Sequence, residues 1–170
     1  MTTNLRYENP ILFNQENLWD PNNQEPMVQV IDAILNEEDL DNTNITEQTE
    51  EELFQTCKDV ISEILKEVPE LENDLKGEVV YPLVCTSSFA DYPLPFFAPE
   101  NGKTITVVFN SMWNKSWGGE LITYYKTKPK DVVSIMPGRI FMSEGSAWCR
   151  ITQPNINATV PLTYLQFRLI

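Results

Sequence analysis

The sequence predicts an α+β protein in which helices come first and a β-rich core follows. An apolar stripe with helical spacing precedes residue 70, whereas from Gly77 onward apolar residues alternate with polar ones or form short β-branched runs. The strands do not alternate with helices, which argues against a parallel sheet. With 170 residues, 42% of them hydrophobic, the chain is long enough to bury a core. We expect an arm over residues 1–25 and one domain over residues 26–170, with helices in 26–76 and the β core in 77–170.

The first 25 residues are rich in Asn, Gln and Pro, which is typical of an extended arm. Phe13, Leu18 and Trp19 are its candidate anchoring side chains, either on the arm's own domain or on a neighbouring protein. A short helix is predicted next, because proline is tolerated in a first helical turn and apolar residues then follow at helical spacing. These residues are Pro26, Met27, Val30, Ile31, Ile34 and Leu35.

An acidic and polar loop is predicted over residues 37–44. Asp39 and Asp41 resemble a calcium loop in composition alone, because the glycine and the terminal glutamate of such a loop are missing. The clearest helix follows and begins with a capping box at Thr49 and Glu52. Its apolar stripe extends to Val68, where Pro69 ends it, and Cys57 lies on that stripe as core filling.

The β-rich part is predicted to form two stacked sheets, as a sandwich or jelly roll, because seven or more short strands follow the helices. The expected strands are residues 78–86, 103–110, 119–126, 131–135, 139–143, 148–153 and 162–169. Turns are expected at residues 93–95, 99–102, 128–130, 137–138, 144–145 and 154–157.

The net charge of −13 is concentrated in the first half of the chain. Residues 1–77 hold 19 acidic and 4 basic residues, and residues 78–170 hold 6 and 8, so the balances are −15 and +2. Such a distribution repels phosphate backbones and anionic lipids, so we expect neither a nucleic-acid nor a membrane partner.

The sequence also bears on the compartment of the protein. It contains no apolar run long enough to span a bilayer and no signal-peptide pattern, so we expect a cytoplasmic protein rather than a secreted one. Cys57, Cys85 and Cys149 are odd in number and widely separated, which predicts reduced thiols and no zinc site.

One group of motifs resembles a known family. The motifs are Asn110-x-x-Trp113, Trp117-Gly118-Gly119-Glu120-Leu121, Pro137-Gly138-Arg139 and the final Phe167-Arg168-Leu169. The order of the parts is similar to the catalytic core of the 2-oxoglutarate and Fe(II)-dependent dioxygenases, of the small prolyl-4-hydroxylase-like type. The resemblance covers about residues 78–170 and implies a double-stranded β-helix with two buttressing helices before it.

The chain departs from the family at the residues that carry its chemistry. Members hold iron with an H-x-D motif and a second, distal histidine, but this chain has no histidine. The H-x-D position falls on Phe89 and Asp91, and the distal histidine falls on Trp148 or Cys149. The basic residue that clamps 2-oxoglutarate falls near Leu162.

These losses predict a pseudoenzyme without a metal or another cofactor. One carboxylate and one thiol leave a poor iron site, and a leucine cannot pair a buried dianion. We expect Phe89 and Trp148 to fill the hollow instead. Asp91 must then be solvated or hydrogen-bonded, and Arg139 is expected to remain as a structural ion-pair partner.

Three functions are compatible with this sequence. The first is a structural or interaction protein with protein partners in a larger assembly, contacted through the arm; the resemblance implies a bacteriophage virion as one setting. The second is an unusual oxygenase that uses Asp91, Cys149 and water. The third is a module that binds a sugar or peptide near aromatic residues. Those residues are Tyr92, Trp113, Trp117, Tyr124 and Trp148.

Overall fold

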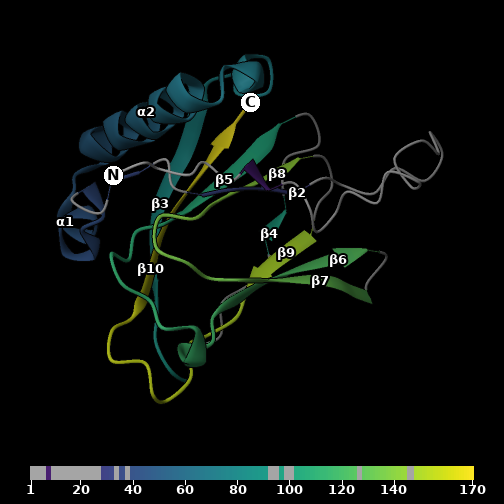
Figure 1. Ribbon diagram of the computed structural model, residues 1–170. Coiled ribbons are helices and arrows are strands. Elements are labelled where there is room, and N and C mark those ends of the chain that lie inside the picture. The colour runs from purple at the N-terminus through teal and green to yellow at the C-terminus, as the bar shows by residue number, and fades with distance from the viewer. Residues whose placement is uncertain are drawn as a thin grey trace.

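The fold combines two antiparallel sheets with a few helices, which confirms the predicted α+β class (Figure 1). The computed structural model describes residues 7–8, 28–32, 35–36, 39–91, 96–97, 102–125, 128–144 and 148–170. Phe13, Leu18, Trp19 and most of the predicted arm lie outside these residues.

The described part of the chain contains short strands and a few helices. In chain order, the strands are β1 (Tyr7–Glu8), β2 (Val28–Ile31), β3 (Val79–Ser87), β4 (Phe96–Phe97), β5 (Lys103–Val108), β6 (Glu120–Tyr125), β7 (Lys128–Ser134), β8 (Ile140–Glu144), β9 (Trp148–Ile151) and β10 (Leu162–Leu169). The helices are α1 (Asn42–Glu47) and α2 (Glu50–Glu67), with 3₁₀ turns η2 (Pro69–Glu72) and η3 (Lys115–Trp117).

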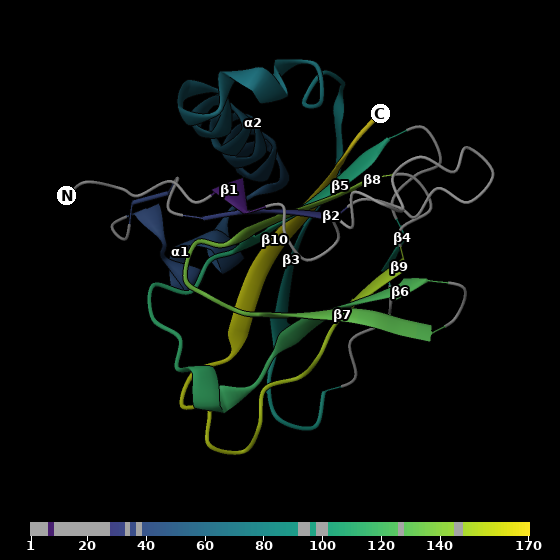
Figure 2. The same ribbon diagram turned by 45° about the vertical axis from the view of Figure 1, so that its right-hand side comes forward.

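The described strands form a six-stranded sheet in the order β1-β2-β8-β5-β10-β3 and a four-stranded sheet in the order β4-β9-β6-β7. Helix α2 lies across one face of the larger sheet, and the smaller sheet lies on its other side, so that the larger sheet is the middle layer (Figures 1 and 2). Each side of the larger sheet has its own hydrophobic cluster.

The helix predicted over residues 49–68 is confirmed as α2. Its N-cap Thr49 accepts a hydrogen bond from the Glu52 amide, and the Glu52 carboxylate accepts one from the Thr49 amide, which forms the expected capping box. Cys57, Val60 and Ile64 are buried against the larger sheet, because they share the apolar stripe of the helix.

The helix predicted from Pro26 is wrong. Residues 28–31 form strand β2, which pairs with β8 and places Val30 and Ile31 in the two different clusters. Neighbouring side chains of a strand point to opposite faces, so both residues are buried without a helical stripe. Directly after β2, Asp32 forms an ion pair with Arg139, which confirms the structural pairing expected of Arg139.

The predicted loop over residues 37–44 is also wrong in part, because it contains the start of α1. Asp41 is the N-cap of this helix and accepts hydrogen bonds from the amides of Thr43 and Asn44. Asp41, one of the two aspartates that resemble a calcium loop, therefore caps a helix. Asn36 donates a hydrogen bond to Asp39 at 3.4 Å.

The turn predicted at residues 128–130 is wrong, because these residues begin strand β7. Pro129 is tolerated there because β7 is an edge strand in which an N–H is not required on the open side. Pro129 pairs with Tyr124 of β6, and the register between β6 and β7 shifts between Thr123 and Tyr124. The strands predicted around β3, β5, β6, β8, β9 and β10 are confirmed, with ends that differ by a few residues.

Between the two sheets lies a cluster of buried side chains, which we call the inter-sheet cluster. Its buried members are Val30, Val108, Trp113, Trp117, Leu121, Val133, Ile135, Phe141, Cys149, Ile151, Leu162 and Tyr164. All are carbon-rich, so this part of the interior is packed as a core.

Candidate functional site

Asp91, the candidate iron-binding aspartate, is exposed and closes a turn with its own neighbours. Its carboxylate accepts a hydrogen bond from the Ser88 amide at 2.6 Å, and its amide donates to the Ser88 carbonyl at 3.1 Å. Ala90 adopts a positive φ of 73° inside this turn. The expectation that Asp91 would be solvated or bonded to a donor is therefore confirmed. Its local role is that of a turn-closing side chain.

Phe89 does not fill the interior, so this expectation is wrong. The side chain is 56% exposed. It lies in the turn that follows β3, beyond the paired part of the strand. A match to a family motif predicts the position of a residue along the chain but not the packing around a turn.

Cys149 and Leu162, in contrast, are both fully buried in the inter-sheet cluster. Cys149 of β9 lies between Thr123 of β6 and Phe96 of β4, and Leu162 of β10 lies opposite Ser87 of β3. Leu162 is thus placed at the end of β3 that leads into the Phe89 turn.

Trp148 is half-buried and contacts another aromatic ring. Its ring centroid lies 5.2 Å from that of Tyr124, with the planes 32° apart. Trp148 precedes the inward-facing Cys149 on the same strand, so the two side chains lie on opposite faces of β9. Of the two positions considered for the distal histidine, only Cys149 faces the interior, so the expectation that Trp148 fills the hollow is wrong.

The Cys149 thiol is poorly suited to chemistry. Burial raises its pKa to about 12, although a hydrogen bond with Ser143 acts in the opposite direction. The thiolate, which is the nucleophile and the metal ligand, is therefore almost absent at neutral pH. Burial also raises the pKa of Cys57 to about 12.

The tryptophan and glycine motif has a structural role. Trp113 Nε1 donates a hydrogen bond to the Gly118 carbonyl at 3.0 Å, and the Trp113 and Trp117 rings meet edge to face with centroids 5.2 Å apart. At Gly119, with φ of 76°, a Cβ atom would come within 3.3 Å of Leu162. The left-handed backbone conformation favours glycine at this position, and a Cβ would also press on the Leu162 side chain.

The predicted aromatic pocket is not formed as a unit in the described part of the chain. Trp113 and Trp117 belong to the inter-sheet cluster, whereas Tyr124 and Trp148 make a separate ring contact. Tyr92 lies outside the described residues.

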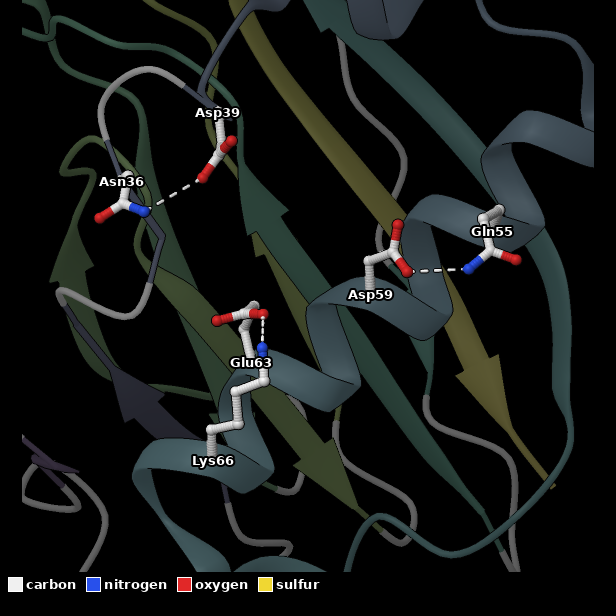
Figure 3. A network of polar contacts seen from close by, with 6 residues as sticks. All are labelled: Asn36, Asp39, Gln55, Asp59, Glu63 and Lys66. Carbon is white, nitrogen blue, oxygen red and sulfur yellow. Dashed lines mark hydrogen bonds and ion pairs between the residues drawn. The ribbon is translucent and has the colours of Figure 1, made fainter.

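A groove of about 400 Å³ lies between the loop before α1 and helix α2, and it contains several carboxylates. Figure 3 shows how these groups are held: Gln55 donates to Asp59 at 2.8 Å, Asn36 donates to Asp39, and Lys66 pairs with Glu63. Each of the three carboxylates has a side-chain partner. Among the residues that the structure describes, no group of three or more His, Cys, Asp or Glu is placed to hold a metal ion.

A second groove, of about 580 Å³, was not predicted from the sequence. It lies between the first turns of α2 and the start of β3. Its lining residues are Glu50, Phe54, Glu78, Val79, Val80, Tyr81, Pro82 and Leu83. Pro82 inside a predicted strand is the signal that could have indicated it, because proline in a sheet marks an edge strand.

The described helices include none that is both long and apolar enough to cross a membrane.

Comparison with known proteins assigns no family. No family model matches the sequence, and no curated protein matches it. Among solved structures, the chain is similar to a prolyl-4-hydroxylase from Pseudomonas putida, with a TM-score of 0.46 and 9% sequence identity, over 88% of this chain and 74% of that chain. A likeness at this level establishes neither membership of a family nor an activity.

Proposed function

We propose that this chain is a non-catalytic interaction protein, built on a degenerate dioxygenase-like jelly roll and serving as a rigid part of a larger assembly. The observation that carries the proposal is the state of the candidate site. Cys149 and Leu162 are 0% exposed in a carbon-rich cluster, in a chain that has no histidine at all.

The residues at this site do not fit Fe(II) and 2-oxoglutarate. Imidazole is the ligand that completes the facial triad beside a carboxylate, and this chain has none to supply. The Asp91 carboxylate is engaged by the Ser88 amide, and the Cys149 thiol is neutral. Leu162 offers no positive charge to a dicarboxylate, whose burial without a partner is costly.

The metal question is decided by elemental analysis and a turnover assay. The purified protein is incubated with Fe(II), ascorbate and 2-oxoglutarate, and bound iron and oxoglutarate consumption are measured. We expect no stoichiometric iron and no consumption above that of heat-denatured protein. The control is Asp91→Asn, because turnover by contaminating iron would be the same in both proteins. Stoichiometric iron, with turnover lost in Asp91→Asn, would overturn the proposal.

The proposed contact with the assembly is the arm, through Phe13, Leu18 and Trp19. Its length and its scattered large apolar side chains suit a segment that anchors on a neighbour. A virion is the setting that the family resemblance implies, and the arm is where we place the contact.

The arm is tested by comparing the intact protein with a variant in which Phe13, Leu18 and Trp19 are alanine. Cross-linking in the native assembly should join the intact protein to a defined neighbour, and the variant should lose that product. An intact protein that remains a compact monomer, with its arm folded on its own domain and no neighbour cross-linked, would contradict the proposal.

A further inference from the structure

Strand β3 lies at an edge of the larger sheet and leaves one side of its backbone open. It pairs with β10 along its length, and no other strand pairs with it within the described residues. In an antiparallel sheet, alternate N–H and C=O groups of an edge strand point away from the sheet. Such an edge is a template for a further strand unless the chain blocks it.

Part of this edge is blocked by the sequence itself. Tyr81 has a positive φ of 54°, and the register between β10 and β3 shifts at this point. Pro82, the next residue, has no N–H to donate. Bulges and prolines protect edges against unspecific pairing, so the start of β3 cannot add a continuous strand. Residues 83–87 keep a regular register with β10, and no described strand pairs with their other side. Leu83 and Thr86 are exposed, whereas Ser87 is buried, so the accessible part of this edge is residues 83–86.

The blocked end of β3 carries the groove of about 580 Å³. Phe54, Val79 and Val80 give it apolar walls, and Tyr81 and Leu83 are 71% and 54% exposed at its border. Glu50 and Glu78 are exposed and line the same groove. Two carboxylates in an apolar groove beside an open strand suit a segment with both apolar and basic side chains.

A second copy of this chain is a poor occupant of the edge. Pairing β3 with β3 would bring together two chains that each carry a net charge of −13. Like charges placed together at an interface oppose association. Arg168, whose guanidinium lies 6.0 Å from the centre of the Tyr81 ring, is a basic group at this border.

We propose that residues 83–86 of β3, together with the adjoining groove, bind an extended basic and apolar segment of a partner protein by strand addition. The partner's backbone continues the larger sheet, and its basic side chains pair with Glu50 and Glu78. This inference rests on the proposed function and deepens it, because it gives the interaction protein a second contact and defines the chemistry of the partner.

The probe is a synthetic peptide of alternating lysine and valine with blocked ends, titrated into the isotope-labelled full-length protein. Amide chemical shifts and hydrogen-exchange protection are recorded for each residue. We expect the largest changes in residues 83–86 and around Glu50 and Glu78, and weaker binding at higher salt. A peptide of alternating glutamate and valine should not bind.

Two pairs of variants make the test specific. Glu50→Gln/Glu78→Gln should weaken binding about fivefold at low salt, because each exposed ion pair contributes a fraction of a kcal/mol. The matched control is Glu70→Gln/Glu72→Gln, which removes two exposed carboxylates from η2 and should leave binding unchanged. Leu83→Lys should abolish binding, whereas Val132→Lys, on edge strand β7 of the other sheet, should not.

The proposal is overturned if the peptide binds at β7, binds equally in its acidic form, or does not bind at all. Self-association of the protein through β3, detected by analytical ultracentrifugation and lost in Leu83→Lys, would also overturn it in favour of a second copy. None of these results bears on oxygenase activity, and oxoglutarate turnover would overturn the proposed function whether or not the peptide binds.

Discussion

Arg139 donates two parallel hydrogen bonds to Asp32, which lies 107 positions earlier in the sequence. Arg139 Nε donates to Asp32 Oδ1 at 2.8 Å, and Nη2 donates to Oδ2 at 2.7 Å. Arg139 Nη1 also donates to the Ser134 carbonyl at 2.8 Å. The pair is largely shielded, with 8% and 13% of the two side chains exposed. It joins the end of β2 to the turn between β7 and β8, and so holds an early strand in the larger sheet.

Removing one partner of this ion pair should destabilise the folded protein. We expect Arg139→Met to lower the free energy of unfolding by about 3–5 kcal/mol, because it leaves the Asp32 carboxylate shielded and uncompensated. Urea unfolding measures the loss. Asp32→Leu/Arg139→Met should lose clearly less than the sum of the two single variants, since no charge is then left alone.

The control for this prediction is the exposed pair of Lys66 and Glu63, in which 62% and 42% of the side chains are exposed. Lys66→Met should change stability far less than Arg139→Met, because water and salt screen an exposed ion pair. A similarly small effect for Arg139→Met would show that the shielded pair does not hold β2 in place.

The same region shows why part of the fold could not be predicted from the sequence. Local periodicity predicts a helix where β2 lies, because Val30, Ile31, Ile34 and Leu35 fit a helical spacing. What makes residues 28–31 a strand is their pairing with β8, more than 100 positions later, and local periodicity carries no information on that pairing. Helix α2 was predicted correctly because its capping box and its stripe are both local.

In the candidate site, too, some features follow from the local sequence and others depend on how the chain folds. The burial of Cys149 follows from the alternation along β9, which the sequence displays. Leu162 lies in the part of β10 where four successive residues are buried, because hydrophobic clusters cover both faces of the sheet there. The exposure of Phe89 depends on how the chain turns after β3, and Ser88, Ala90 and Asp91 determine that turn through backbone geometry. The groove beside β3 joins two segments about 30 positions apart, so only the fold brings Glu50 and Glu78 together.

The capping box of α2 is a second target for mutation. Thr49→Ala should lower the free energy of unfolding by about 1 kcal/mol, because the Glu52 amide loses its side-chain acceptor. Chemical denaturation followed by circular dichroism measures the change. Ser62→Ala, at an exposed position inside α2, is the control and should be neutral or slightly stabilising. Equal effects of the two substitutions would contradict a capping role.

The buried thiols predict that stability falls in alkaline solution. Burial raises the pKa of Cys57 and of Cys149 from 9.0 to about 12, so the unfolded chain releases these protons first. Above about pH 9 the unfolded state therefore binds fewer protons than the folded state, and the free energy of unfolding decreases with pH up to about pH 12. Each thiol should contribute a loss of about 1 kcal/mol at pH 10.

Urea unfolding at about pH 8 and about pH 10 gives the slope of the free energy of unfolding against pH. The control is Cys57→Ala/Cys149→Ala, which should be less stable at both values but should show a shallower dependence on pH. If the slope is unchanged in the double variant, other groups cause it. Tyr164, whose pKa burial also raises, is the next candidate.

The last prediction concerns the packing on which the proposed function depends. Leu162 is fully buried in the inter-sheet cluster, and its Cδ2 atom lies 3.3 Å from the position that a Cβ at Gly119 would take. Leu162→Ala should therefore lower the free energy of unfolding by about 2–5 kcal/mol, because it leaves a cavity in a close-packed region. Leu83→Ala removes the same atoms from a side chain that is 54% exposed and should cost clearly less. If the two substitutions cost the same small amount in urea unfolding, Leu162 borders open space, and a small molecule such as a dicarboxylate would have room to bind beside it.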